Sequence, residues 1–169
     1  MAKENTNSLQ IEYSYDNNSN VNKAKYSLGT DNKETKYNYD RDNRINSVVT
    51  ENDMVVTNYD NLSRVINKTI YRDEKAYATQ YEYLDTEIVN KTTEKVKSIT
   101  NGNNELISYT YDTNGNIETI KEGNTEKQRY YYDGLNQLIR EDNKDLNKTI
   151  VYTYDLGGNI VTKKEYAYT

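Results

Sequence analysis

The sequence predicts an all-β protein made of about seven antiparallel β-hairpin repeats, which form a curved, extended ribbon or a partial β-shell. Three observations support this prediction. The pattern Tyr-x-Tyr-Asp recurs at intervals of 20 to 28 residues. An aliphatic residue follows each copy at a fixed distance. Gly, Asn and Asp, which form turns, separate short runs of Tyr, Thr, Val and Ile, which favour strands.

The repeat has seven anchor segments, at residues 13–16, 37–40, 57–60, 81–84, 109–112, 130–133 and 152–155. Thr57 replaces the first Tyr of one copy and Leu84 replaces the Asp of another. Side chains alternate between the two faces of a strand, so Tyr-x-Tyr places both rings on one face. The predicted structural anchors are Tyr13, Tyr15, Asp16, Tyr37, Tyr39, Asp40, Tyr59, Asp60, Tyr81, Tyr83, Tyr109, Tyr111, Asp112, Gly115, Tyr130, Tyr132, Asp133, Tyr152, Tyr154, Asp155 and Gly158.

Each Asp is expected to end a strand and to accept hydrogen bonds from the backbone amides just beyond it. Gly or Asn then takes the positive-φ position of a short loop. The aliphatic residue five positions after the Asp begins the return strand and packs across the hairpin against Tyr. The seven aliphatic residues are Val21, Ile45, Val65, Val89, Ile117, Leu138 and Ile160.

A second turn is expected in each period, and it is visible at residues 100–103, 122–125 and 141–144. Residues 73–76 and 94–97 contain helix-forming residues but no apolar stripe over three turns, so at most one short helix is expected. Residues 1–8 are expected to be a disordered tail, native or added for expression. Residues 9–169 are expected to be one repeat region.

The recurring Tyr-x-Tyr-Asp-x-x-Gly-Asn-Ile pattern resembles the YD repeats of the Rhs family. The resemblance is strongest at residues 109–117, 130–138 and 152–160. Before residue 96 it is weaker, because Ser19, Asn43 and Ser63 stand where the family has Gly. YD repeats build a long antiparallel ribbon that spirals into a hollow shell, as in bacterial polymorphic toxins, the C components of insecticidal toxin complexes and teneurins.

The resemblance implies a role for the chain. In bacterial members of the family the shell encloses a toxic C-terminal domain, and a segment with an Asp-Pro-x-Gly pattern seals it. The sequence has no Pro, so that segment is not expected in it. The chain is therefore expected to be a non-catalytic scaffold segment of a large exported protein, which acts outside the cell or at its surface. Its expected partners are the rest of that protein, the enclosed domain and, through edge strands, other copies.

Composition excludes several chemistries. The 169 residues include 19 Tyr but no His, Cys, Pro, Trp or Phe, which removes His-based nucleophile systems, disulfides and the usual zinc or haem ligands. A formal charge of −5 argues against nucleic acid as a partner. No apolar run has the ~18–20 residues needed to span a bilayer, so membrane insertion is not expected. No cofactor or metal is expected.

The main alternative is a carbohydrate-binding or adhesion module that uses exposed Tyr rows, because aromatic rings stack on sugars. The candidate residues are Tyr109, Tyr111, Tyr130, Tyr132, Tyr152 and Tyr154. The same residues fit the inner layer of a sheet, and their strict spacing relative to the turn favours that structural interpretation.

The acidic residues offer two further alternatives. A calcium site needs 6–8 converging oxygens, and one Asp per repeat supplies too few unless neighbouring turns stack, so turn capping is favoured. A glycosidase needs two carboxyls ~5–9.5 Å apart, a spacing that some of the 27 acidic residues would meet by accident. No catalytic residue is therefore predicted.

Overall fold

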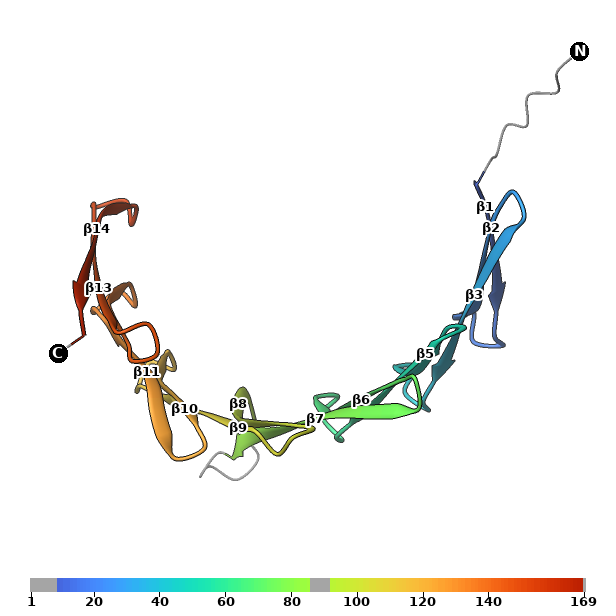
Figure 1. The fold of residues 1–169 in the computed structure, drawn as a ribbon, viewed down its shortest axis with the longest axis horizontal. Helices are drawn as coiled ribbons and strands as arrows, with labels where there is room; N and C mark the ends of the chain where they lie inside the picture. Colours follow the sequence, from blue (N-terminus) through green and yellow to red (C-terminus); the bar gives the residue numbers. More distant parts are fainter. Residues whose placement is uncertain (1–8, 86–91, 169) are drawn as a thin grey trace, which may run out of the picture. The chain divides into compact units, whose positions relative to one another are not determined.

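The computed structural model describes residues 9–85 and 92–168, and in this part of the chain every regular element is a β-strand (Figure 1). The strands are β1 (Leu9–Tyr15), β2 (Val21–Leu28), β3 (Asp31–Tyr39), β4 (Ile45–Val49), β5 (Asp53–Tyr59), β6 (Val65–Arg72), β7 (Lys75–Asp85), β8 (Thr92–Asn101), β9 (Leu106–Tyr111), β10 (Ile117–Glu122), β11 (Thr125–Tyr132), β12 (Leu138–Asn143), β13 (Lys148–Tyr154) and β14 (Ile160–Ala167). The all-β prediction is confirmed. The predicted tail at residues 1–8 lies outside the described residues.

The strands follow one another in the sheet in the order of the chain, and neighbouring strands are antiparallel. The predicted series of antiparallel hairpins is therefore confirmed. The chain forms two compact units, Met1–Gln80 and Tyr81–Thr169, and the boundary between them falls within β7. Each unit is a run of hairpins in which a strand packs mainly on the strands before and after it.

The hairpins closed by an Asp turn share one register. In the β3–β4 hairpin, Tyr39 lies opposite Ile45 and Asn38 lies opposite Ser47, so Asn46 bulges out between them. The same bulge follows the first residue of the return strand in the hairpins that close at Asp16, Asp60, Asp112, Asp133 and Asp155. Six of the seven predicted aliphatic residues begin the return strand as expected. Val89 lies outside the described residues.

The turns at the other edge of the ribbon agree with the sequence only in part. The turn predicted at 122–125 lies between β10 and β11, and the one at 100–103 begins two residues late, after β8. The prediction of a turn at 141–144 is wrong, because 141–143 belong to β12 and the turn follows at 144–147. Asp142 is held in the strand by the Thr149 hydroxyl, which donates to its carboxylate over 2.7 Å, and by Arg140 Nε at 2.9 Å.

The two segments considered for a short helix are not helical. Residues 94–97 lie within β8. Asp73 and Glu74 form the tight turn between β6 and β7, with φ values of 48° and 61°. Neither segment has the apolar stripe that would give a helix a face to bury, and each extends a ladder of strands instead.

Burial follows the alternation of a single-layered sheet. Tyr37 and Tyr39 are half-buried while Asn38 between them is exposed, and Tyr109, Thr110 and Tyr111 repeat this pattern. We call the side of the sheet that carries the Tyr-x-Tyr pairs the tyrosine face. Few side chains are fully buried, because one layer of strands has no second layer to cover it. Ala24, which lies opposite Tyr13 on this face, is the most buried apolar residue in the described chain, at 1% exposure.

Candidate functional site: the aspartate turns and the tyrosine face

The Asp112 turn shows how one carboxylate shapes a hairpin. Asp112 Oδ1 accepts the backbone N–H groups of Asn114 and Asn116 at 2.9 and 2.8 Å. The N–H of Gly115 donates to the carbonyl of Asp112 at 3.0 Å, with Gly115 at a φ of +91°. The N–H of Asp112 donates to the carbonyl of Asn116 and closes the loop at 2.9 Å. The predicted role of Asp as an acceptor for turn amides is confirmed.

The same three features recur in the other turns. Each Asp accepts from the amides two and four positions later in the turns of Asp16, Asp40, Asp60, Asp133 and Asp155. The residue three positions after each of these Asp residues has a positive φ. The residue type varies, because these positions are occupied by Gly158, by Asn43 and Asn136, and by Ser19 and Ser63. The backbone conformation of the turn is thus kept where Gly is missing from the sequence.

The residue four positions after the Asp was not singled out in the sequence, yet it carries the contact between neighbouring turns. Asn116 Nδ2 donates to Asp112 Oδ2 at 3.0 Å and also to Asn136 Oδ1, in the next turn, at 2.9 Å. In the first unit, Arg44 donates through Nε to Asp40 Oδ2 at 2.7 Å and through Nη1 to Ser63 Oγ at 2.9 Å. The shared signal at this position is a side chain with several N–H donors.

These bonds change the acidity of the turn carboxylates. The bond from the Asn116 side chain lowers the pKa of Asp112, and the Arg44 side chain lowers that of Asp40. The backbone amide of Asn20 lowers the pKa of Asp16. The Asn159 side chain lowers the pKa of Asp155. The ionised form of each group is the one that the fold favours.

In five repeats, the second Tyr position of the anchor joins the repeat to the one before it. Tyr132 lies on the tyrosine face, and its hydroxyl donates to the carbonyl of Ile117 at 3.0 Å. The acceptor is the residue that begins the return strand of the preceding hairpin. Equivalent bonds run from Tyr39 to Val21 (2.8 Å), Tyr59 to Ile45 (2.9 Å), Tyr111 to Val96 (2.7 Å) and Tyr154 to Leu138 (2.7 Å).

The bond made by Tyr111 differs from the others in the position of its acceptor. The acceptor for Tyr111 is Val96, within β8, and Val89, the aliphatic residue predicted for that repeat, lies outside the described residues. The pairing of β8 with β9 agrees with this acceptor. Ser98, two positions after Val96, lies opposite Ser108, just as Arg140, two positions after Leu138, lies opposite Val151. In β8 the acceptor is therefore the fifth residue of the strand, whereas Val21, Ile45, Ile117 and Leu138 are each the first residue of theirs.

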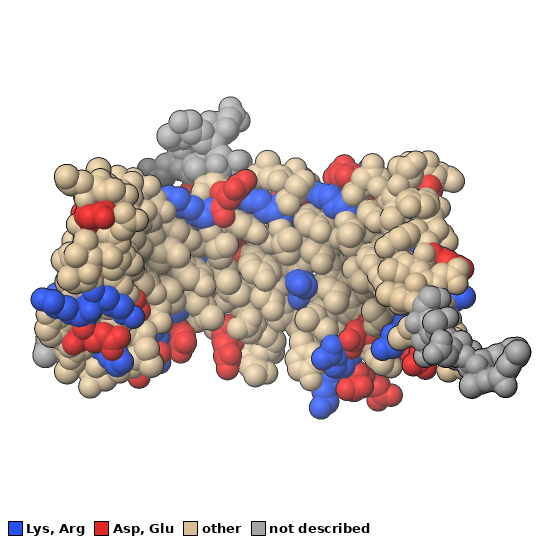
Figure 2. Space-filling model, turned by 90° about the horizontal axis from the view of Figure 1, so that it is seen from above, with Lys and Arg blue, Asp and Glu red and all other residues tan. Residues whose placement is uncertain are grey.

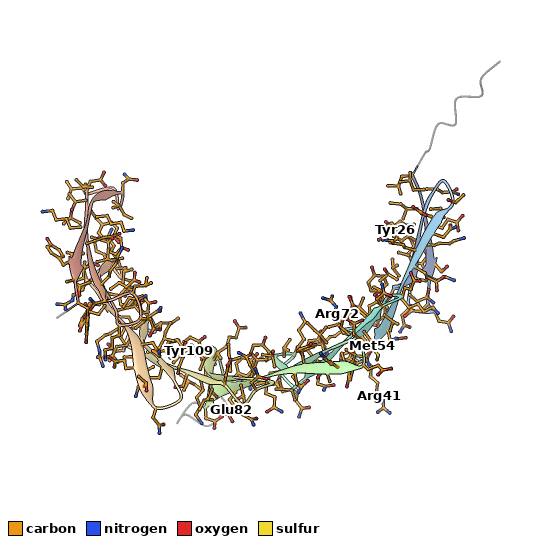
Figure 3. The ribbon with its side chains drawn as sticks, viewed as in Figure 1. Tyr26, Arg41, Met54, Arg72, Glu82 and Tyr109 are labelled. Carbon is orange, nitrogen blue, oxygen red and sulfur yellow. The ribbon has the colours of Figure 1, made fainter. Side chains whose placement is uncertain are left out.

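The six tyrosines proposed for carbohydrate binding lie together on the tyrosine face of the second unit. All six are half-buried, and burial raises the pKa of Tyr111, Tyr130 and Tyr132. The hydroxyls of Tyr111, Tyr132 and Tyr154 are committed to backbone carbonyls. In Figure 3, Tyr109 lies on the opposite side of the ribbon from Glu82. Their carbohydrate-binding role stays a prediction.

Charged side chains lie mostly near the margins of the face shown in Figure 2, which looks down on the ribbon from above Figure 1. Many of them are paired across strands, as Lys148 Nζ is with Glu165 Oε2 at 2.7 Å. No three acidic residues gather in a cluster suited to a metal ion anywhere within 9–85 or 92–168. Nor does that part of the chain contain a helix with the length and apolar character to cross a membrane.

Comparison with known proteins identifies the fold. No family model and no curated protein matches the sequence. Among solved structures, the crystal structure of TcdB2-TccC3-TEV matches 94% of this chain with a TM-score of 0.57 at 16% identity. TcdB2-TccC3-Cdc42 and TcdB2-TccC3 without its hypervariable C-terminal region each match 91% at 15% identity, with TM-scores of 0.55 and 0.56. This chain spans only 11% of the length of each of these chains.

Proposed function

We propose that the chain is a structural segment of a larger Rhs/YD-repeat protein, in which it forms part of the wall of a β-shell around a toxin or effector domain. The observation that carries the proposal is how the repeat residues are used. The Tyr hydroxyls and the side chains four positions after the Asp bond to the neighbouring repeat, as Tyr132 bonds to Ile117 and Asn116 to Asn136. The repeated residues thus serve the extension of a sheet.

Two further facts support the proposal. The repeat pattern resembles that of the YD-repeat family, and the fold is shared with the TcdB2-TccC3 structures. The short span of the match fits a chain that supplies one stretch of a much longer ribbon. The role in enclosing a domain, and a location outside the cell or at its surface, follow from the family resemblance.

The segment is proposed to be non-catalytic. A general acid or a nucleophilic carboxylate needs freedom to exchange a proton or to attack a substrate. The recurring carboxylates instead accept two backbone N–H groups each, and Asp112 also accepts the amide of Asn116. These bonds favour the ionised form of each carboxylate, in which it caps the turn, so its role is structural.

The test is protease protection in the protein encoded by the full reading frame that contains this segment. If the segment is part of a wall, the enclosed domain resists a protease that cleaves it readily when it is expressed alone. Deletion of residues 112–122, which removes β10 alone, should expose the domain. The exposed-surface variant Glu51→Gln should leave it protected. Equal cleavage of the domain in all three proteins, or a reading frame that encodes no further domain, would refute the proposal.

A further inference from the structure

The turn between β8 and β9, at residues 101–105, has the backbone of an Asp turn, although it lies at the opposite edge of the ribbon. The N–H of Asn101 donates to the carbonyl of Glu105 at 3.0 Å, and the N–H of Asn104 donates to the carbonyl of Asn101 at 2.8 Å. Asn104 has a φ of 60°. These are the loop-closing bonds and the positive φ of the Asp turns, so Asn101 stands where each of those turns has its Asp.

The Asp133 turn shows what an acid does at this position. Both turns have Gly in the second position and, in the fourth, an Asn with a φ of 60° or 61°. Asp133 Oδ1 accepts the N–H groups of Leu135 and Gln137 at 2.9 Å each. The side chain of Asn101, by contrast, takes part in no hydrogen bond within the described ranges. The β8–β9 turn therefore has the shape of an Asp turn but lacks its cap.

An Asn that is followed by Gly can convert itself to an acid. The backbone nitrogen of the Gly attacks Cγ of the Asn side chain, and a five-membered succinimide ring forms. The N–H proton passes through water to the leaving Nδ2, which departs as ammonia. One water then opens the ring at either carbonyl and gives Asp or isoaspartate. Gly favours the attack, because it has no Cβ to crowd the ring and because its backbone adopts many conformations.

The sequence contains two Asn-Gly dipeptides, Asn101-Gly102 and Asn114-Gly115, and the fold constrains only the second. The N–H of Gly115 donates to the carbonyl of Asp112 at 3.0 Å, and the N–H of Asn114 donates to Asp112 Oδ1 at 2.9 Å. The nitrogen that would attack the Asn114 side chain is thus held in the turn. Gly102 is exposed, and its N–H has no hydrogen-bond acceptor in the part of the chain that the structure describes. Its nitrogen is therefore free to attack Asn101.

We propose that Asn101 is a self-modification site, where the side-chain amide is lost through a succinimide with Gly102 and the Asp product caps the β8–β9 turn. The substrate is the chain itself, and the co-reactant is water. In the product, the N–H groups of Asn103 and Glu105 correspond to the two that Asp133 accepts. A carboxylate accepts an N–H more strongly than an amide oxygen does, so the conversion supplies the missing cap. The inference depends on the turn geometry and not on what a parent shell encloses.

The first experiment incubates the 169-residue chain at neutral pH and follows both dipeptides by peptide mapping with mass spectrometry. We expect Asn101 to deamidate about 2- to 12-fold faster than Asn114, because attack on Asn114 first requires the Gly115 bond to break. In urea the two rates should converge. Gly102→Ala should slow the reaction at Asn101, and it adds no left-handed strain because Gly102 lacks a positive φ. Equal rates in the folded chain, or a difference that persists in urea, would overturn the proposal.

The second experiment tests the cap with Asn101→Asp, which makes the Asp product directly. Urea denaturation should show the folding equilibrium shifted towards the native state by about 2- to 12-fold relative to the unaltered chain. Asn124→Asp is the matched control, since it adds the same charge at an exposed position in the turn between β10 and β11, at the same edge of the ribbon. We expect no such gain from the control. Equal stability of the two variants would show that an acid at the first position caps nothing, and the proposed role of the product would be wrong.

Discussion

At the scale of single residues, the second Tyr of the repeat combines two tasks, as Tyr132 shows. Its ring lies half-buried on the tyrosine face, and its hydroxyl satisfies a backbone carbonyl of the neighbouring hairpin. Buried polar groups destabilise a fold unless they are bonded, which makes Tyr better suited to this position than Phe. The sequence contains 19 Tyr and no Phe, and this use of the hydroxyl accounts for that choice at the repeat positions.

Removal of one such hydroxyl should lower stability measurably. Tyr132→Phe keeps the ring but leaves the Ile117 carbonyl without its donor, and we expect a loss of about 0.5–1.5 kcal/mol in the free energy of unfolding. Tyr166→Phe in the same unit is the control, because Tyr166 is largely exposed and lies outside the repeat anchors. Chemical denaturation monitored by circular dichroism measures both. Equal losses would mean that the hydroxyl bond contributes nothing specific.

The turn carboxylates predict a pH dependence. The pKa of Asp112 is lowered in the folded chain from its ordinary value of 3.8, chiefly by the Asn116 side chain, so the unfolded chain binds more protons near that pH. The stabilisation is present above pH 3.8 and is lost as pH falls through the folded-state pKa. The thermal midpoint should therefore fall as pH drops from about 5 towards 2.

Asp112→Asn should reduce that pH dependence, because an amide accepts backbone bonds but does not titrate. Its thermal midpoint should change less between pH 5 and pH 2 than that of the unaltered chain. Glu51→Gln, in a turn at the opposite edge of the ribbon, serves as the control for loss of one negative charge. If both variants flatten the profile equally, net charge and not the turn carboxylate controls acid stability.

The role of a residue could be predicted from the sequence where that role depends only on its neighbours in the chain. The Asp cap and the positive-φ position depend on four or five consecutive residues, so their spacing revealed them. The acceptor of a Tyr hydroxyl lies 14 to 18 residues away and depends on the register between repeats, which no local pattern encodes. Arg44 and Arg64 stand at the Asn position of the Tyr-x-Tyr-Asp-x-x-Gly-Asn-Ile pattern, and both reach the Asp carboxylate through Nε at 2.7 Å.

At the scale of elements, each described hairpin that an Asp turn closes contains one residue in the left-handed region, three positions after the Asp. Gly115 has a φ of +91°, which side chains disfavour, and a Cβ there would also meet the Lys95 side chain. Gly134 lies in the Asp133 turn directly after the Asp, whereas Gly115 lies three positions after its Asp. A Cβ at Gly134 would have nothing within 4 Å. The two glycines therefore separate the demands of turn conformation from the general effect of adding a methyl group.

We expect Gly115→Ala to destabilise the chain by about 1 kcal/mol, because it forces Ala into a left-handed conformation. Gly134→Ala should be neutral or should stabilise by about 0.4–1 kcal/mol, because Gly134 lacks a positive φ and Ala restricts the unfolded chain. Urea denaturation of the two variants measures the difference. If both variants lose the same stability, the positive φ of the turn is not what requires Gly115.

The errors at this scale come from competition between turn composition and pairing. Glu141-Asp142-Asn143-Lys144 has the composition of a turn, but Asp142 is 6% exposed and bonded across the β12–β13 ladder to Thr149. Asn143 still has a turn role, since its Oδ1 accepts the N–H of Leu146 at 3.0 Å. The composition predicted the turn at these polar residues, whereas pairing of β12 with β13 extends the strand to Asn143 and places the turn at residues 144–147.

At the scale of the whole molecule, the constant register makes repeats interchangeable. Every junction between two repeats within the described ranges uses the same offset, and each repeat contacts mainly its neighbours. Stability in such an array approximates a sum of repeat and neighbour terms, so one unit can be removed without loss of the rest. The deletion must remove a whole repeat of two strands, because removal of a single strand would reverse the direction of every later strand.

Deletion of residues 112–132 satisfies that condition. It removes β10 and β11 and joins Tyr111 to Asp133, so β9 runs directly into the Asp133 turn and can pair with β12 as β11 does. Tyr111 keeps Val96 as its acceptor and Tyr154 keeps Leu138. We expect a folded protein with the same circular dichroism per residue, a cooperative melt and a modestly lower midpoint.

Deletion of residues 112–122 removes β10 alone and is the decisive contrast, although it takes away fewer residues. β11 would then follow β9 in the place of β10, and the Asp133 turn would move to the opposite edge of the ribbon, away from the other Asp turns that it must contact. We expect loss of the cooperative melt and of the native sheet signal. If this shorter deletion were tolerated as well as the longer one, the repeat would not be the unit of stability, because register between whole repeats would then be dispensable.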